Sequence, residues 1–278
     1  MADTEVMWSG LTLGGDTGYI LEEITGWEDL PDVTSYDTAR SRGHGDHVGD
    51  QYARSRIVTV SGKIANVSSR DEMARALQNA TRVGSAVNNL TVDLLGLALT
   101  AGARVTQRSV SIGGNYSVGE IPFAVQWRCP DPLRYGLTQT PASIGLPSTS
   151  GGLPYPLSYP LNYGSAGTPG QITLTNSGTA DTSILFTVTG PLPSGFEISA
   201  GGQRLTYAAE VPAGQVITLD TGTGIVLAEG TADRRGNLTK ADWLQVPAGS
   251  SITVQFTSLG GTYDAAATLS ASWRSAWW

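Results

Sequence analysis

The chain has 278 residues, which is enough for two domains of ordinary size, and its hydrophobic content of 40% is enough to build real cores. Its 35 glycines and 14 prolines, with charged residues at only 15%, favour short strands joined by tight turns. The formal net charge of −7 argues against a surface that binds nucleic-acid phosphates, and a single cysteine excludes an internal disulfide.

The first part of the chain, to about Tyr135, predicts strands with one exposed interruption. Residues 5–13 and 19–27 are predicted strands on either side of a glycine turn. Residues 40–52 are polar and glycine-rich, so we expect a loop or a long exposed hairpin tip there. Residues 56–64 then alternate between apolar and polar, which is typical of a half-buried strand.

One helix is predicted after these strands. Ser69 and Glu72 have the spacing of a capping box, apolar residues follow at helical intervals, and Gly84 is the expected stop. After the helix, Ile121 to Trp127 shows the clearest period of two in this half of the chain and predicts another strand.

The composition changes after the first domain. We expect an N-terminal domain at 1–135, a Pro- and Gly-rich linker or arm at 136–170, and a C-terminal domain at 171–278. About eight alternating segments without a helix predict a β-sandwich for the last of these. No signal peptide and no membrane-spanning segment is expected.

Three patterns could carry chemistry, and each has a simpler interpretation. His44, Asp46 and His47 could begin a metal site, but soft glycines surround them and no further histidine exists, so a solvated loop or a subunit contact is favoured. Asp220 opens the Asp-Thr-Gly triplet of aspartic proteases, which need two such triplets. Only one copy is present, so a hairpin turn is the favoured interpretation. Cys129 lacks a nearby base and is expected to be buried. We therefore expect no enzyme, no metal and no cofactor.

The aromatic end of the chain leaves two interpretations open. Trp273 is expected in the core, while Trp277 and Trp278 either cover an open sheet edge or anchor an interface with another molecule.

The order of several short motifs resembles a known family. The motifs run from Met7-Trp8-Ser9-Gly10 through Arg56-Ile57-Val58-Thr59-Val60-Ser61-Gly62 and Phe123-Ala124-Val125-Gln126-Trp127 to Asn176-Ser177-Gly178 and Ser272-Trp273-Arg274. In this order and spacing the chain resembles the distal tail proteins of long-tailed siphophages, often labelled minor tail proteins, along essentially its whole length.

The resemblance implies a mainly β fold with two domains. The first would be a β-sandwich with one α-helix and a projecting hairpin, and the second a galectin-like or jelly-roll β-sandwich. It also implies a structural virion protein, made in the host cytoplasm, that forms a hexameric ring at the distal end of the tail tube. The ring would join the tube to tail-tip or baseplate proteins and take part in host attachment.

The implied partners are further copies of the chain, the tail tube protein, the tape measure and the hub proteins, with DNA passing through but not specifically bound. A host-surface glycan is a possible ligand, since the alternative function is a carbohydrate-binding module formed by the C-terminal domain. The candidate residues for the ring interface are His44, Asp46, His47, Asp50 and Tyr52. We also expect acids of the first half to face the lumen and repel DNA, with candidates Glu22, Glu23, Glu28, Asp29 and Asp32.

Overall fold

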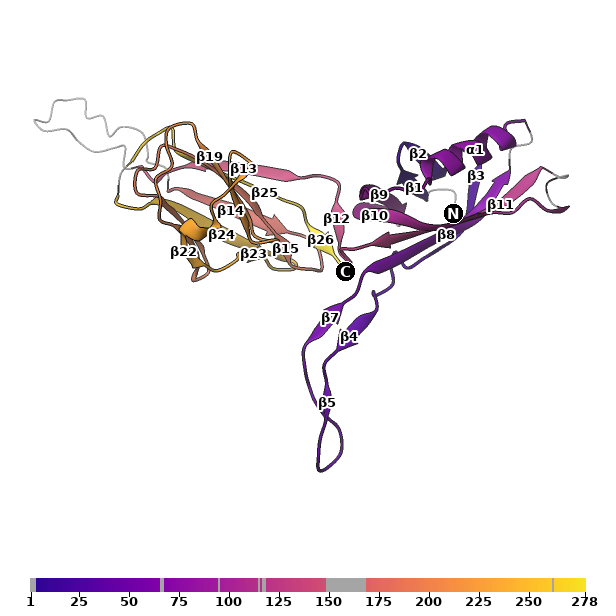
Figure 1. Ribbon diagram of the computed structural model, residues 1–278, viewed down its shortest axis with the longest axis horizontal. Coiled ribbons are helices and arrows are strands. Elements are labelled where there is room, and N and C mark those ends of the chain that lie inside the picture. The colour runs from indigo at the N-terminus through magenta and orange to yellow at the C-terminus, as the bar shows by residue number, and fades with distance from the viewer. Residues whose placement is uncertain are drawn as a thin grey trace, which may run out of the picture. The chain divides into compact units, whose positions relative to one another are not determined.

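The computed structural model describes residues 4–65, 68–94, 96–114, 116, 119–148, 169–261 and 263–278. It divides into two compact units, the first formed by residues 1–137 with Trp277–Trp278 and the second by residues 138–276. Strands dominate both units, and the α-helix lies in the first (Figure 1), so the predicted mainly β class is confirmed. The helix is too short to cross a bilayer, and no other candidate span exists among the described residues.

The first unit is built on an antiparallel sheet that bends over itself. Strand β10 runs for fourteen residues and takes part in both halves of the bend, because its first half pairs with β9 and β12 and its second half pairs with β11. Its register shifts between Val105 and Gln107, which is where an irregularity lets a strand bend. The order along the sheet is β2-β1-β9-β10-β11-β8-β3, and β12 also pairs with β26. The bounds are β1 (Glu5–Trp8), β2 (Leu11–Gly14), β3 (Tyr19–Thr25), β8 (Arg56–Ala65), β9 (Asn88–Leu94), β10 (Leu97–Val110), β11 (Glu120–Cys129), β12 (Arg134–Gly136) and β26 (Ala276–Trp277).

The apolar side chains of the alternating strands fill the space inside this bend. Val58 and Val60 of β8 and Val125 of β11 are fully buried, as the period of two predicts. Trp8 and Trp127 meet edge to face between the two halves of the sheet, with ring centroids 5.9 Å apart. Each fully buried side chain of this size contributes about 2–3 kcal/mol, so the aromatic contact is a main link between the two halves.

Helix α1 (Arg70–Ala80) packs on this sheet through Ala74 and Leu77. The helix ends at Ala80, earlier than the expected stop at Gly84, and Thr81 is its C-cap residue. The backbone N–H and the hydroxyl of Thr81 both donate to the Leu77 carbonyl, at 3.0 and 2.5 Å. At its start, Ser69 occupies the N-cap position but makes no side-chain capping hydrogen bond, so the expected capping box is absent. The helix is held instead by its packing and by hydrogen bonds from neighbouring strands.

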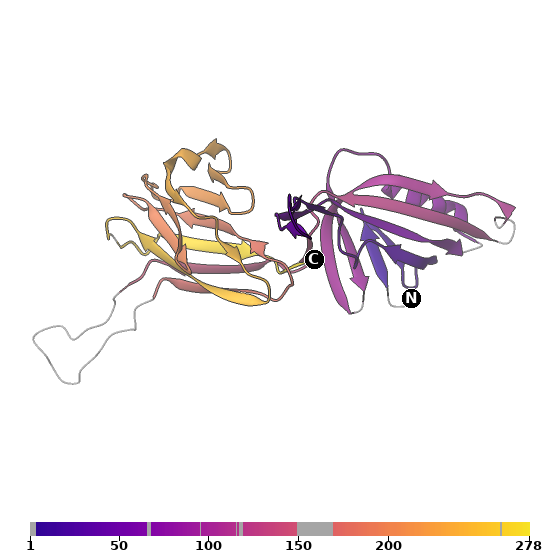
Figure 2. The same ribbon diagram turned by 90° about the horizontal axis from the view of Figure 1, so that it is seen from below.

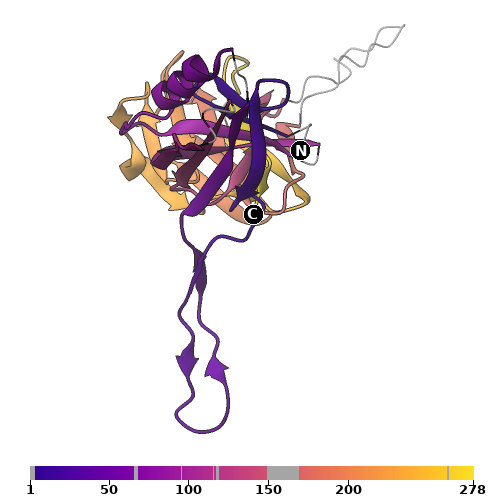
Figure 3. The ribbon, with the colours of Figure 1, turned by 90° about the vertical axis from the view of Figure 1, so that its right-hand side faces the viewer.

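A long two-stranded hairpin leaves the first unit between β3 and β8. Its lower part pairs β4 (Val33–Ser35) with β7 (Gln51–Ala53), and its outer part pairs β5 (Thr38–Ala39) with β6 (Asp46–His47). The hairpin projects away from the sheet (Figures 1 and 3), as the predicted architecture requires. It is longer than the loop expected at 40–52, since strand pairing already begins at Val33.

The second unit is a β-sandwich of two antiparallel sheets (Figure 2). The six-stranded sheet has the order β13 (Thr140–Gly145), β25 (Thr268–Trp273), β16 (Leu185–Thr189), β19 (Val216–Asp220), β20 (Ile225–Ala228) and β21 (Ala232–Asp233). The five-stranded sheet has the order β14 (Gln171–Asn176), β24 (Ser250–Ser258), β17 (Phe196–Ala200), β18 (Gln203–Tyr207) and β22 (Leu238–Ala241). A small pair, β15 (Thr182–Ser183) with β23 (Gln245–Val246), and a 3-10 turn, η2 (Arg235–Asn237), complete the unit.

The core of this sandwich lies between the two sheets. Phe186 comes from one sheet and Phe196 and Phe256 from the other, and all three are fully buried. The ring of Phe196 stacks on Tyr207 with centroids 5.1 Å apart, so the aromatic side chains fill the core in a fixed arrangement. The predicted β-sandwich is confirmed.

The structure differs from the expected linker at 136–170. Residues 140–145 form the edge strand β13, which pairs along its whole length with β25, and Leu146 after it is buried in the core of the sandwich. Pro141 is compatible with this place because an edge strand has one side without ladder hydrogen bonds. The second unit therefore begins near Thr138, and the Pro- and Tyr-rich stretch at 153–157 lies outside the described residues.

Candidate assembly interfaces

The projecting hairpin carries all five residues predicted for a ring interface. His44 lies in the tip, Asp46 and His47 form β6, Asp50 follows it, and Tyr52 lies in β7. All five are exposed, and no residue from 32 to 52 is buried. A segment of this length without a core of its own is a surface available for a partner.

Two contacts keep the hairpin extended. The ring of Tyr52 meets that of Tyr36 edge to face, with centroids 6.1 Å apart. The carboxylate of Asp37 accepts hydrogen bonds from the Ser35 hydroxyl at 2.6 Å and from the Gly49 backbone N–H at 2.8 Å. These two hydrogen bonds, that from Ser35 first, lower the pKa of Asp37. The two arms of the hairpin are thus joined by a charged side chain as well as by the ladder.

The histidines of the hairpin lie at exposed positions of its outer part. Among the described residues, no group of three or more His, Cys, Asp or Glu side chains comes together to hold an ion. His47 pairs in the ladder with Thr38, and Asp46 with Ala39, as ordinary strand residues do. The interpretation of this stretch as a solvated loop or a subunit contact stays a prediction.

Arg56 fixes the base of the hairpin, and sequence reasoning missed it. Its side chain is buried, and its Nη1 donates to the carbonyls of Gly26 at 2.9 Å, Trp27 at 2.8 Å and Asp29 at 2.6 Å. Its Nε donates to the carbonyl of Pro132 at 2.9 Å. Burial lowers the pKa of Arg56, which its guanidinium tolerates because its ordinary pKa lies far above neutrality. A signal did exist, since Arg56 stands at an inward position of the alternating strand that continues with Val58 and Val60.

A second buried arginine binds the end of the chain. Arg134 forms an ion pair with Glu28 at 2.5 Å, lies over the ring of Trp27 at 5.7 Å, and donates from Nη2 to the backbone carbonyl of Trp278. Trp277 is half-buried and packs against the core of the first unit, while Trp278 is 43% exposed. Of the two terminal tryptophans, Trp278 is therefore the one that retains surface for another molecule.

The other motifs singled out in the sequence have structural roles. The carboxylate of Asp220 accepts from the backbone N–H groups of Gly222 at 2.9 Å and Thr223 at 3.3 Å, which closes a turn at the end of β19. Cys129 is fully buried, and burial raises the pKa of its thiol to about 11, which is the opposite of what a nucleophile needs.

The five acids expected to face a lumen are in different situations. Glu28 is engaged by Arg134, and Asp29 accepts from the backbone N–H of Gly26 at 2.7 Å. Glu22, Glu23 and Asp32 are exposed. Of the five, these last three are the ones whose carboxylates make no hydrogen bond or ion pair with a described residue.

Solved structures show a likeness over the whole chain. The Dit protein of phage SPP1, described as a paradigm of the hub adsorption apparatus in phages infecting Gram-positive hosts, matches with a TM-score of 0.67 and 12% identity, covering 98% of each chain. Two structures of the phage p2 baseplate in its activated conformation, with Ca and with Sr, match with TM-scores of 0.44 and 0.43 and 9% identity, covering 93% of this chain and 99% of theirs. No protein-family model and no curated protein sequence matches. The chain therefore has the fold of the SPP1 distal tail protein along its whole length, and the expected architecture is confirmed.

Proposed function

We propose that this chain is a structural component of a phage virion, located at the tail tip. It forms a hexameric ring at the distal end of the tail tube, joins the tube to tail-tip or baseplate proteins, and takes part in host attachment. The observation that carries this proposal is the likeness in fold to the SPP1 Dit protein over 98% of both chains, because a partial match would leave room for a shared domain in an unrelated assembly.

The hairpin is the arm that reaches the neighbouring copy. A closed ring needs a heterologous interface, in which one surface meets a different surface of the next copy. The hairpin supplies a long exposed surface, from His44 through Asp46, His47 and Asp50 to Tyr52. Arg56 fixes its base, so the arm leaves the unit in a defined direction.

The remaining partners follow from the same place in the tail. They are the tail tube protein, the tape measure and the hub proteins, while DNA passes through the ring without being bound specifically. The net charge of −7 for each chain supports this, since an acidic ring does not hold phosphates. The role needs neither a cofactor nor catalysis.

The hexamer is tested with the purified full chain. Native mass spectrometry should give six copies, and electron-microscopy class averages should show a ring. Deletion of residues 43–49 should leave a folded monomer, as judged by circular dichroism. Tyr52→Ala should weaken the ring, whereas Tyr263→Ala, at a tyrosine of similar exposure in the second unit, should not. Hexamers that survive the deletion would show that the arm lies elsewhere.

Glycan binding is the alternative that the second unit must be tested for. At the outward positions of β14, β16, β24 and β25, the side chains are mostly Ser, Thr and Gln, and none is aromatic. Sugar sites usually offer an aromatic ring for stacking, so these strand faces favour the structural role. A glycan array probed with the full chain should remain blank, and a specific signal would favour the carbohydrate-binding module instead.

A further inference from the structure

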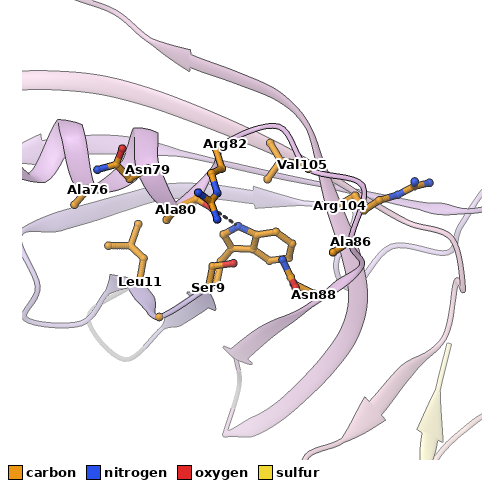
Figure 4. Close-up of a pocket in the computed structure, with 13 residues that line it drawn as sticks. Ser9, Leu11, Ala76, Asn79, Ala80, Arg82, Ala86, Asn88, Arg104 and Val105 are labelled. Atoms are coloured by element: carbon orange, nitrogen blue, oxygen red, sulfur yellow. Dashed lines mark hydrogen bonds between the residues drawn. The ribbon is translucent and has the colours of Figure 1, made fainter.

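Two adjoining hollows lie where helix α1 ends on the first unit. One has a volume of about 540 Å³, and the other about 360 Å³. Arg82 and Val105 line both, Arg104 lines the first, and Arg108 lines the second. Figure 4 shows the first hollow, with Arg82 on the loop after the helix and Arg104 on β10. Three arginines from two elements thus border one continuous recess.

Two of these arginines have no side-chain partner among the residues that the structure describes. Arg108 is used locally, since its Nη1 donates to the Gln78 carbonyl at the end of the helix at 2.8 Å. Arg82 and Arg104 are exposed, and neither side chain makes a hydrogen bond or an ion pair with a described residue. Arg104 also stands directly opposite Arg128 on β11, an arrangement of like charges that destabilises a sheet unless a carboxylate compensates it.

The loop beside the recess exposes apolar side chains. Val83 is 99% exposed and Val87 is 53% exposed, and both belong to the segment that joins α1 to β9. Apolar side chains next to unpaired arginines are typical of the edge of a protein interface, where Arg is enriched.

The matching charge lies on the edge strand β3. This strand pairs only with β8 among the described strands, so its outer side is open. A register shift between Leu21 and Glu23 leaves Glu22 as an extra residue, and such a bulge turns side chains outward. Glu22 and Glu23 are both exposed and form no ion pair within the described chain. On the neighbouring strand β8, Lys63 lies opposite Ile20 and near Glu22, but it is already paired with Glu120 at 2.8 Å. The edge therefore keeps the negative charge of Glu22 and Glu23.

We propose that the recess bordered by Arg82 and Arg104 receives the Glu22–Glu23 edge of a second copy. The inference rests on the proposed ring and names a contact within it. The two surfaces are different parts of one unit, one beside β10 and the other on the terminal strand of the sheet, as a heterologous contact between copies requires. Pairing would also relieve the repulsion between Arg104 and Arg128.

This contact assigns Glu22 and Glu23 to the space between copies and not to a lumen. A carboxylate that pairs with an arginine of the next copy no longer repels DNA, so the acidic lining expected from the sequence would have to come from other residues. A polyanion could bind the same arginines, and the experiment separates the two.

Charge reversal in the full chain tests the contact. Arg82→Glu with Arg104→Glu should lower the fraction of hexamer by about tenfold or more, because two like-charged surfaces then face each other. Glu22→Arg with Glu23→Arg should do the same. The variant that combines all four substitutions should regain the hexamer, since the pairs are restored with opposite sign. Arg75→Glu with Arg234→Glu is the matched control, because it makes the same change in charge at exposed arginines outside the recess.

The outcomes distinguish this proposal from the ring itself. Hexamers that persist in both double variants would overturn the contact and leave the ring standing. Loss of the hexamer in both double variants without recovery in the fourfold variant would overturn the pairing of these two surfaces. A natural chain that stays monomeric would overturn both proposals. Binding of duplex DNA that depends on Arg82 and Arg104, with unchanged hexamers, would show that the recess is a phosphate site instead.

Discussion

At the scale of single residues, Arg56 carries the largest predicted effect on stability. Arg56→Ala would leave three carbonyls of the hairpin base, one buried and two partly buried, without this donor, at a cost of about 1–3 kcal/mol for a buried one. We expect a loss of about 3–5 kcal/mol in the free energy of unfolding, measured by urea denaturation of the full chain. Arg56→Lys should recover little, because one ammonium cannot reach all four carbonyls.

The matched control for this change is the neighbouring Arg54→Ala. Arg54 is exposed and donates only its side-chain Nε to the Thr34 hydroxyl at 2.7 Å, so its removal should stay within about 0.5 kcal/mol. Equal losses for the two variants would show that the buried hydrogen bonds of Arg56 do not hold the base of the hairpin.

Cys129 gives a second prediction at this scale, one that depends on pH. Because burial raises the pKa of its thiol to about 11, almost no thiolate exists in the folded chain at pH 8. The stabilisation from the neutral thiol is complete below its ordinary pKa and is lost as the pH rises toward 11. A thiol reagent such as DTNB should leave the native chain unmodified at pH 8 and label the urea-unfolded chain fully. Rapid labelling of the native chain would contradict the buried position.

At the scale of elements, the projecting hairpin is joined across its two arms by Asp37. Asp37→Ala removes both side-chain hydrogen bonds, so limited proteolysis should cut the hairpin faster while thermal unfolding of the two units changes little. Asp50→Ala is the control, since it removes the same charge from the same hairpin, but its carboxylate bonds to no described residue. The pKa of Asp37 is lowered, so the contribution of its carboxylate is present at neutral pH and disappears as the pH falls through that lowered pKa. Equal cleavage of the two variants would argue against this role.

The strands that the sequence predicted best are those whose two faces meet different surroundings. Val58 and Val60 on β8 and Phe123 and Val125 on β11 alternate because one face packs on the core and the other faces solvent. Strand β13 was missed because it lies at an edge and includes Pro141 and Gly145, which ordinarily argue against a strand. A short-range pattern cannot show that a segment such as β13 pairs with a strand more than a hundred residues later in the chain, as it does with β25.

The candidate interface was predicted unevenly for a related reason. The hairpin residues could be found because polarity and glycine content mark an exposed segment locally. The recess was not found, because Arg82 and Arg104 are far apart in sequence and come together only through the packing of α1 on the sheet that contains β10. Pairing of charges across a fold is a property of tertiary structure, and a single sequence does not display it.

At the scale of the whole molecule, the boundary of the second unit has a direct test. A fragment of residues 138–276 should fold alone, because it contains β13 and all partners of its core. A fragment beginning at residue 171 lacks β13 and Leu146, exposes the edge of β25, and should aggregate or unfold at a lower temperature. The melting temperatures of the two fragments, measured by circular dichroism, give the comparison. If the fragment from residue 171 is as stable as the longer one, the second unit begins at residue 171 and not at residue 138.

The first unit is discontinuous in sequence, since it takes up Trp277–Trp278 after the second unit has ended. In the terms of gene evolution, the second unit is an insertion, because the coding segments of the first unit flank it on both sides. Recombination at these two positions would replace the whole sandwich as a cassette, while Arg134 and the core of the first unit would keep the residues that they bind. Such an exchange would change the surface that the second unit presents without rebuilding the unit that carries the hairpin.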